Sequence, residues 1–173
     1  NLLESLKDIK KKCLVIIITT DKVYENKEWE YNYRENDILG GNDPYSASKA
    51  ACEIAVSSWI KSFIGIESYQ NSNLQVSTVR AGNVIGGGDW SNNRIVPDTI
   101  KSIINKSTLT IRNPNATRPW QHVIEPLWGY LKLAEYMDRN NGFSSSFNFG
   151  PTIHGIKTVK QLIEEIQKVS GIN

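Results

Sequence analysis

Tyr45 and Lys49 are the residues of this chain whose types and spacing could do chemistry. They stand four residues apart in Tyr45-Ser-Ala-Ser-Lys49, at the start of an apolar-faced helical pattern, and this spacing stacks both side chains on one helical face. A free phenol ionises near pH ~10 and a free ammonium near pH ~10.4, so neither group alone suits proton transfer at neutral pH. An ammonium beside a phenol lowers the pKa of the phenol and makes it a usable general base toward a hydroxyl group. Because Tyr-x-x-x-Lys also occurs by chance on surface helices, the surrounding elements must support this interpretation.

The elements that position this pair follow an α/β order. Residues 13–18 and 74–80 have the pattern of buried parallel strands, and residues 146–149 form a later strand. The other expected elements are helices over residues 1–9 and 96–105, a strand over 109–112, and helices opened by Pro44 and by Pro126. The packing stripe of the Pro44 helix consists of Ala51, Ile54, Ala55, Ser58 and Trp59. A last helix begins with a capping box of Thr158 and Gln161. Strands alternate with helices, which predicts a doubly wound, mostly parallel sheet with helices on both faces.

In such sheets, ligands bind beyond the carboxyl ends of the strands. Thr19–Lys22 follow the first strand, Tyr45 and Lys49 begin the next helix, and residues 81–89 follow the second strand. We therefore expect these polar residues to line one site. For Thr20 and Asp21 taken alone, a simpler interpretation is that they cap a turn.

The composition is that of an ordinary globular domain. The chain has 173 residues, of which 39% are hydrophobic and 22% charged, and its net charge is +2. The basic run Lys10–Lys12 lies between two apolar segments, so we expect no nucleic-acid partner, and no apolar run has membrane length. Cys13 and Cys52 lack CxxC spacing, which predicts reduced, buried thiols in a cytoplasmic protein. His122 and His154 have no ligand-spaced acids or thiols near them, so no metal site is predicted.

Four longer stretches resemble the extended short-chain dehydrogenase/reductase family. They are residues 20–29, 41–49, 80–90 and 112–123, and the resemblance covers nearly all of residues 13–170. Within the family the chain resembles the dehydratases that act on CDP-glucose, because the relatives that act on dTDP-glucose carry an acid where this chain has Lys22. The resemblance implies NAD as cofactor, a sugar nucleotide such as CDP-glucose as substrate, and a place in deoxysugar biosynthesis.

The resemblance also implies how the chain is divided. Residues 1–93 would form the C-terminal part of a Rossmann-like NAD-binding catalytic domain, whose sheet is incomplete here. Residues 94–173 would be mainly a small substrate-binding subdomain for the sugar nucleotide, with residues 122–150 returning to the core domain. By analogy with the family, the full-length protein would be a homodimer or tetramer that pairs through the helix bearing Tyr45 and the helix before it.

The implied reaction oxidises C4 of the sugar, eliminates water across C5 and C6, and returns the hydride to C6, giving CDP-4-keto-6-deoxyglucose. The resemblance makes Tyr45 the base at the C4 hydroxyl, while Lys49 holds the nicotinamide ribose and Thr20 bonds the oxygen that becomes the ketone. Asp21 would protonate the departing C6 hydroxyl, and Lys22 would take the C5 proton. An alternative for Lys22 is an ion pair with Asp21 or with Glu25.

The resemblance assigns the remaining site residues to ligands. The further cofactor contacts are Thr19, Ala81 and Val84, and the substrate contacts are Asn83, Arg94 and Arg118. Arg118 would fork across the diphosphate with Arg94 assisting, since a planar guanidinium matches phosphate geometry. Arg94 is nearly as well explained as an ordinary residue at the start of a helix.

The chain departs from the family at the cofactor. A dinucleotide fold carries a Gly-x-x-Gly-x-x-Gly turn after its first strand and an acid about 20 residues later. Neither is present, and Gly86–Gly88 follows a late strand and opens no helix at the required spacing. We therefore expect a C-terminal piece that lacks the segment for the ADP half of NAD.

From this we predict that the chain alone does not turn over substrate. The measurement is an assay with CDP-glucose and added NAD⁺, and the formation of product would contradict the prediction. Two other interpretations of the site stay open. One is an epimerase or a dehydratase for another nucleotide sugar, and the other is a non-catalytic scaffold in which Thr20, Tyr45 and Lys49 are incidental.

Overall fold

A computed structural model of the chain describes residues 2–64, 72–141 and 144–171. The chain divides into two compact units. The first comprises Asn1–Ala81 and Pro126–Phe149, and the second comprises Gly82–Glu125 and Gly150–Asn173. The division by role that the sequence implied, at residues 93 and 94, stays a prediction.

A three-stranded parallel sheet forms the centre of the first unit. β2 (Leu74–Ala81) lies between β1 (Cys13–Ile18) and β6 (Ser146–Phe149), and Cys13 pairs with Leu74. Every residue of β2 except the last is buried, as expected for a central strand covered on both faces. The prediction of an α/β fold with a parallel sheet is confirmed.

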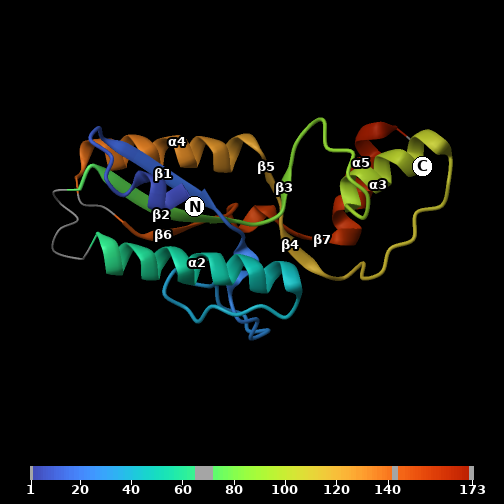
Figure 1. The fold of residues 1–173 in the computed structure, drawn as a ribbon. Coiled ribbons are helices and arrows are strands. Elements are labelled where there is room, and N and C mark those ends of the chain that lie inside the picture. Colours follow the sequence, from blue (N-terminus) through green and yellow to red (C-terminus); the bar gives the residue numbers. More distant parts are fainter. Residues whose placement is uncertain (1, 65–71, 142–143, 172–173) are drawn as a thin grey trace. The chain divides into compact units, whose positions relative to one another are not determined.

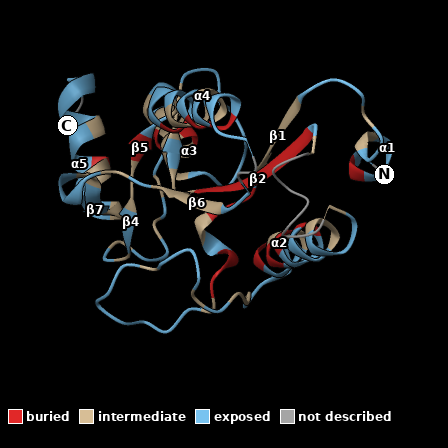
Figure 2. Cartoon of the chain, turned by 90° about the vertical axis from the view of Figure 1, so that its left-hand side faces the viewer, coloured by how far each residue is buried: buried red, intermediate tan, exposed pale blue. Residues whose placement is uncertain are grey.

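Helices cover both faces of this sheet (Figure 1). α1 (Leu2–Leu6) and α2 (Pro44–Phe63) pack against one face, and α4 (Ile124–Arg139) packs against the other. The buried residues concentrate on β2 and on the side of α2 that meets the sheet (Figure 2). Successive strand residues point to opposite faces, so each face has its own apolar cluster. The α2 side buries Leu3, Val56, Leu74 and Val76, and the α4 side buries Val79, Leu133 and Met137.

On the α2 side, the sheet changes from apolar to polar along the strand direction. Leu74 and Val76 lie at the amino end of β2, and Thr78 and Arg80 follow on the same face with 4% and 3% of their surfaces exposed. Buried polar groups need partners inside the protein because they have lost their bonds to water. Glu53 of α2 supplies the partner for both residues.

The packing face of α2 is not the predicted one. The buried residues of this helix are Ser46, Ala50, Glu53 and Val56. Of the predicted stripe, Trp59 packs partly against the apolar cluster, whereas the side chain of Ile54 is 57% exposed. The apolar pattern predicted the wrong buried face of α2 because it took no account of Glu53. The charged side chain of Glu53 points toward the polar half of the sheet, so the helix face that contains Glu53 is the buried one.

Within its described residues, the second unit is built from short elements. Two small sheets pair β3 (Val84–Ile85) with β5 (Gln121–His122) in parallel and β4 (Thr117–Pro119) with β7 (Ile156–Thr158) antiparallel, and η3 (Ile153–Gly155) precedes β7. α3 (Ile95–Asn105) contacts α5 (Val159–Ser170). The capping box predicted from Thr158 and Gln161 is present at the start of α5, so this prediction is confirmed.

Three other predicted elements differ from the structure. The predicted strand over residues 109–112 is absent, because no strand in the described part of the chain pairs with this segment. The first helix ends at Leu6 rather than residue 9, and Ile9 packs against the α2-side cluster from outside the helix. α4 begins at Ile124, two residues before Pro126, which is tolerated in a first turn because its missing N–H has no helical partner there. No helix in the described ranges is long and apolar enough to cross a membrane.

The two sides of α4 provide a matched test of the packing. Leu133 is 7% exposed and contacts the sheet-side cluster, whereas Leu131 on the same helix is 66% exposed. We predict that Leu133→Ala lowers the free energy of unfolding by about 2–5 kcal/mol, because the side chain leaves a cavity. Leu131→Ala removes the same atoms from the surface and should change it by less than about 0.5 kcal/mol. Chemical denaturation of both variants measures the difference, and equal losses would contradict the assigned packing.

Candidate active site

The segment after β1 lies at the carboxyl end of the sheet. Thr19 and Thr20 are buried, and Thr20 caps a short 3-10 helix, η1 (Asp21–Val23). Its Oγ1 accepts from the backbone N of Lys22 at 3.4 Å and donates to Oδ1 of Asp21 at 3.2 Å. The turn-capping interpretation therefore describes the local geometry of Thr20 correctly. A hydroxyl has one O–H, so Thr20 can donate to a ligand only when this O–H turns away from Asp21, and the cap to Lys22 can stay in place meanwhile.

Tyr45 and Lys49 occupy the first turns of α2. Asp43 caps the helix by accepting from the backbone N of Ser46 at 3.0 Å and from its Oγ at 2.6 Å. The hydrogen bonds from Ser46 hold the pKa of Asp43 below its usual range, so the cap keeps the negative charge that a helix N-terminus favours. Pro44 opens the first turn, as predicted. Tyr45 is 52% exposed.

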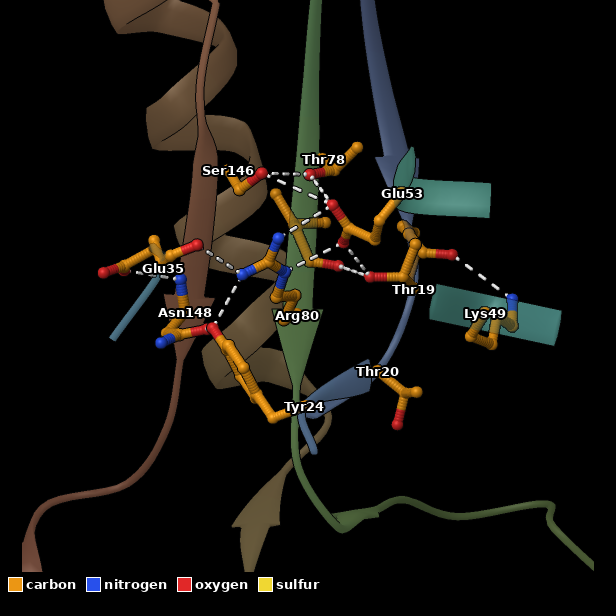
Figure 3. A network of polar contacts seen from close by, with 12 residues as sticks. Thr19, Thr20, Tyr24, Glu35, Lys49, Glu53, Thr78, Arg80, Ser146 and Asn148 are labelled. Carbon is orange, nitrogen blue, oxygen red and sulfur yellow. Dashed lines mark hydrogen bonds and ion pairs between the residues drawn. The ribbon is translucent and has the colours of Figure 1, made fainter. Parts of the chain in front are cut away.

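Lys49 connects this helix to the end of β1. Its Nζ donates to the backbone carbonyl of Ile18 at 3.4 Å, directly before Thr19 and Thr20 (Figure 3). An ammonium has three N–H groups, so this single contact leaves donors for a ligand. The structure thus places Lys49 at the strand end that precedes Thr19 and Thr20, and the roles predicted for these residues stay predictions.

A buried ion pair lies behind these residues. Nε and Nη2 of Arg80 donate to Oε1 and Oε2 of Glu53, each at 2.9 Å, and the two side chains are 3% and 2% exposed. Oγ1 of Thr19 and Oγ1 of Thr78 donate to the two carboxylate oxygens, each at 2.6 Å. Oγ of Ser146 adds a longer contact at 3.3 Å, so α2 is joined to all three strands (Figure 3).

Electrostatics keep this pair ionised. Burial raises the pKa of Glu53, but the hydrogen bonds from Arg80, Thr19 and Thr78 outweigh burial and leave the pKa below its usual range. For Arg80, burial lowers the pKa, and the bonds to Glu53 and Tyr24 more than reverse this. Burial raises the pKa of Tyr24, so its phenol is neutral and donates to Oδ1 of Asn148 at 2.6 Å.

Sequence reasoning missed Glu53 and gave Arg80 no role. Two signals were available. Glu53 continues the four-residue spacing of Tyr45 and Lys49, in a stretch of small residues where a surface helix would carry several charges. Val76, Thr78 and Arg80 occupy every second position of β2, so Arg80 shares the buried face of the other two residues.

Lys22 is exposed, and the structure does not show the alternative ion pair between Lys22 and Glu25. Glu25 pairs with Lys27 at 2.8 Å rather than with Lys22. The charge of Lys22 makes a small contribution to the low pKa of Asp43, after the dominant hydrogen bonds from Ser46. Lys22 therefore acts electrostatically on the N-terminus of α2.

The expected ligand contacts outside this cluster lie mostly in the second unit. Ala81 ends β2 in the first unit, and the others are placed as follows. The backbone carbonyl of Asn83 accepts from the N of Gln121 at 3.0 Å, and Val84 begins β3. Arg94 precedes α3, and its Nε lies 3.7 Å from Oδ2 of Asp89. Arg118 lies exposed on β4, and its Nη1 donates to the carbonyl of Thr117 at 2.8 Å. Their roles stay predictions.

The cysteines and the acidic residues add no further site. Cys13 and Cys52 are free, and they are half-buried rather than fully buried as predicted, because both sit at the margin of the α2-side cluster. Among the residues that the structure describes, no three His, Cys, Asp or Glu side chains gather as metal ligands.

The fold and this site define the class of protein. The chain belongs to the NAD dependent epimerase/dehydratase family, whose model matches residues 1–149. It is similar to the CDP-glucose 4,6-dehydratase of Salmonella typhimurium, with 42% identity over 172 residues that cover 99% of this chain and 48% of that protein. The chain thus spans about half the length of this relative.

Solved structures share the fold. A UDP-glucuronic acid 4-epimerase from Bacillus cereus in complex with NAD superposes with a TM-score of 0.81 at 22% identity, covering 99% of this chain and 51% of that one. A dTDP-glucose 4,6-dehydratase from Streptomyces venezuelae with NAD bound has a TM-score of 0.75 at 21% identity, covering 99% and 48%. At this identity the likeness shows a shared fold.

The low pKa of Glu53 predicts how stability depends on pH. A carboxylate with a depressed pKa contributes stability that is present above its unfolded pKa, about 4.3, and is lost as the pH falls through its folded pKa. The groups that face it are Arg80 and, beyond Arg80, Tyr24 and Glu35. Glu53→Gln should cost about 3–5 kcal/mol at pH 7, because it leaves Arg80 buried without its countercharge.

Urea denaturation from pH 7 to pH 3 measures this effect. The free energy of unfolding of the unmodified chain should fall more steeply below pH ~4.3 than that of Glu53→Gln, which has no carboxyl group to protonate at this position. Parallel curves for the two proteins would contradict the assignment of a depressed pKa to Glu53.

Proposed function

We propose that this chain carries the catalytic residues of an NAD-dependent enzyme that dehydrates CDP-glucose to CDP-4-keto-6-deoxyglucose. The observation that carries the proposal is the contact of Lys49 with the carbonyl of Ile18, because it brings the Tyr45 helix to the strand end that bears Thr20. The 42% identity to a CDP-glucose 4,6-dehydratase supports the choice of substrate.

The residues present fit the nicotinamide half of NAD. Lys49 keeps N–H donors for ribose hydroxyls, and Tyr45, which precedes it by four residues on the same helix, is exposed. When bound, NAD supplies the acceptor and donor of a hydride. Tyr45 removes the proton of the C4 hydroxyl, and Thr20 donates a hydrogen bond to the same oxygen as it becomes a ketone.

The elimination falls to the residues of η1. A ketone at C4 acidifies the C5 proton, which passes to Lys22, and the C6 hydroxyl leaves as water with a proton from Asp21. Lys22 is exposed, so a sugar can reach its amine, and the ammonium must first release a proton to water before it accepts the C5 proton. For the substrate diphosphate, Arg118 and Arg94 of the second unit are the cations, and Asn83 hydrogen-bonds near them.

The proposal extends to assembly and location. Ile54 lies on α2 outside the buried positions of the helix and is 57% exposed, and an exposed apolar residue there supports a homodimer or tetramer of the full-length protein. The two free thiols are in keeping with a cytoplasmic location.

The test is product analysis with the full-length protein, NAD and CDP-glucose. We expect a 4-keto-6-deoxy product, and we expect Tyr45→Phe to lower kcat by about 10²- to 10⁴-fold, because the base is lost. Tyr31→Phe is the matched control, since Tyr31 is 79% exposed and lies outside the site, and its kcat should be unchanged.

Each other interpretation predicts a different result. An epimerase would oxidise C4 without forming the 4-keto-6-deoxy product, and a dehydratase for another nucleotide would prefer the dTDP or UDP sugar. A non-catalytic scaffold would show the same result for Tyr45→Phe and for the unmodified protein.

A further inference from the structure

The ion pair of Glu53 and Arg80 contacts none of the residues proposed to transfer protons. It does contact the residues directly before and directly after the Thr20–Val23 segment, which contains Asp21 and Lys22. Thr19 stands directly before Thr20, and its Oγ1 donates to Glu53 at 2.6 Å. Tyr24 stands directly after η1, and its hydroxyl accepts from Nη1 of Arg80 at 2.7 Å. The Thr20–Val23 segment is thus held at its two ends by the two partners of one ion pair.

The same pair sets the position of Lys49. Glu53 follows Lys49 by one helical turn, so the two side chains lie along one side of α2. Lys49 contacts the carbonyl of Ile18 at 3.4 Å, and Glu53 contacts the side chain of Thr19 at 2.6 Å. Consecutive residues of the β1 end are therefore bound by consecutive turns of α2, and the shorter contact is that of Glu53.

Arg80 extends this constraint to the loop before α2. Nη1 also donates to the carbonyl of Glu35 at 3.0 Å, and the guanidinium carbon lies 5.0 Å from the ring centre of Tyr24. The carboxylate of Glu35 accepts from the backbone N of Asn148 at 2.9 Å, and this ties the loop to β6. The N–H groups of the Arg80 guanidinium point in fixed directions, and they therefore determine where η1, the loop and α2 lie relative to one another.

A stability role alone does not explain a charged pair here. Desolvation offsets most of the attraction between two buried charges, so an apolar pair of similar volume usually serves a fold as well. What two forked hydrogen bonds add is direction, because they fix distance and orientation together.

We infer that Glu53 and Arg80 are positioning residues of the reaction, which hold the Thr20–Lys22 segment and Lys49 in the geometry that proton transfer needs. The inference rests on the proposed function for the chemistry it serves. It adds two residues that act through Thr19, Tyr24 and Lys49 rather than on the substrate.

The decisive variant is the double substitution Glu53→Leu with Arg80→Met in the full-length protein. It replaces the ion pair by apolar side chains, and the hydroxyls that lose Glu53 have other acceptors. Thr19 has the carbonyl of Val79 at 3.2 Å, and Thr78 has Oγ of Ser146 at 2.8 Å. We therefore expect a folded protein whose kcat is lower by about 10- to 100-fold, because misplacement by about 1 Å has this effect on a reaction.

Two readouts separate positioning from a structural role. The KM for the sugar nucleotide should change by less than about 3-fold while kcat falls, because misplaced proton-transfer groups affect the chemical step rather than the binding of substrate. Hydrogen exchange of the backbone over residues 19–24 should become faster, and this is measured without substrate or cofactor. Glu135→Gln removes an exposed ion pair with Lys132 on α4 and should change none of these quantities.

Tyr24→Phe decides the question if the double variant does not fold. It removes the hydroxyl contacts with Arg80 and Asn148 and keeps the ring, and we expect kcat to fall by about 3- to 10-fold with faster hydrogen exchange over residues 19–24. A folded double variant or Tyr24→Phe with unchanged kcat and unchanged hydrogen exchange overturns the inference. Failure of the proposed function looks different, because Tyr45→Phe would then retain activity while the exchange of residues 19–24 still reported on positioning.

Discussion

The buried ion pair of Glu53 and Arg80 is the interaction on which the arrangement of the first unit depends. Both side chains are at most 3% exposed, and the free-energy cost of desolvating them is met by a complete set of hydrogen bonds. Because the donors come from β2, from β6 and from Thr19 directly after β1, this one carboxylate fixes α2 against the ends of three strands at once. An apolar contact would have allowed the helix to slide or rotate, and the directional bonds do not.

This constraint divides the α2 face of the sheet by chemistry. The amino half is apolar, with Leu74 and Val76 packed against Val56 of the helix. The carboxyl half is polar, and there the strands end in residues able to contact a ligand. In parallel sheets all strands end at the same edge, so one polar patch suffices to join the strand ends, the helix and the loop. Packing and chemistry are thus separated along the strands within one interface.

The second unit is built on different principles. Its strands have two or three residues each, and its pairings are short. The residues expected to hold the sugar nucleotide, among them Arg94 and Arg118, lie on its exposed edges and helix ends. Long, flexible side chains on short elements suit the binding of a diphosphate, whereas the residues proposed for proton transfer stand on η1 and on α2.

Sequence alone determined the features that depend on local signals. A continuous β-branched run predicted β1. Pro44 and Asp43 marked the start of the Tyr45 helix, and Thr158 with Gln161 marked the start of α5. These predictions succeeded because strand propensity and capping act between residues close in the chain.

Tertiary structure decided the features that need a distant partner. The inward face of α2 depends on Glu53 meeting Arg80, 27 residues away, and no periodicity within the helix carries that information. The segment 109–112 had a strand pattern, but no strand among the described residues pairs with it. A buried charge or a strand is stable only with its partner in place, and the partner is brought there by the fold.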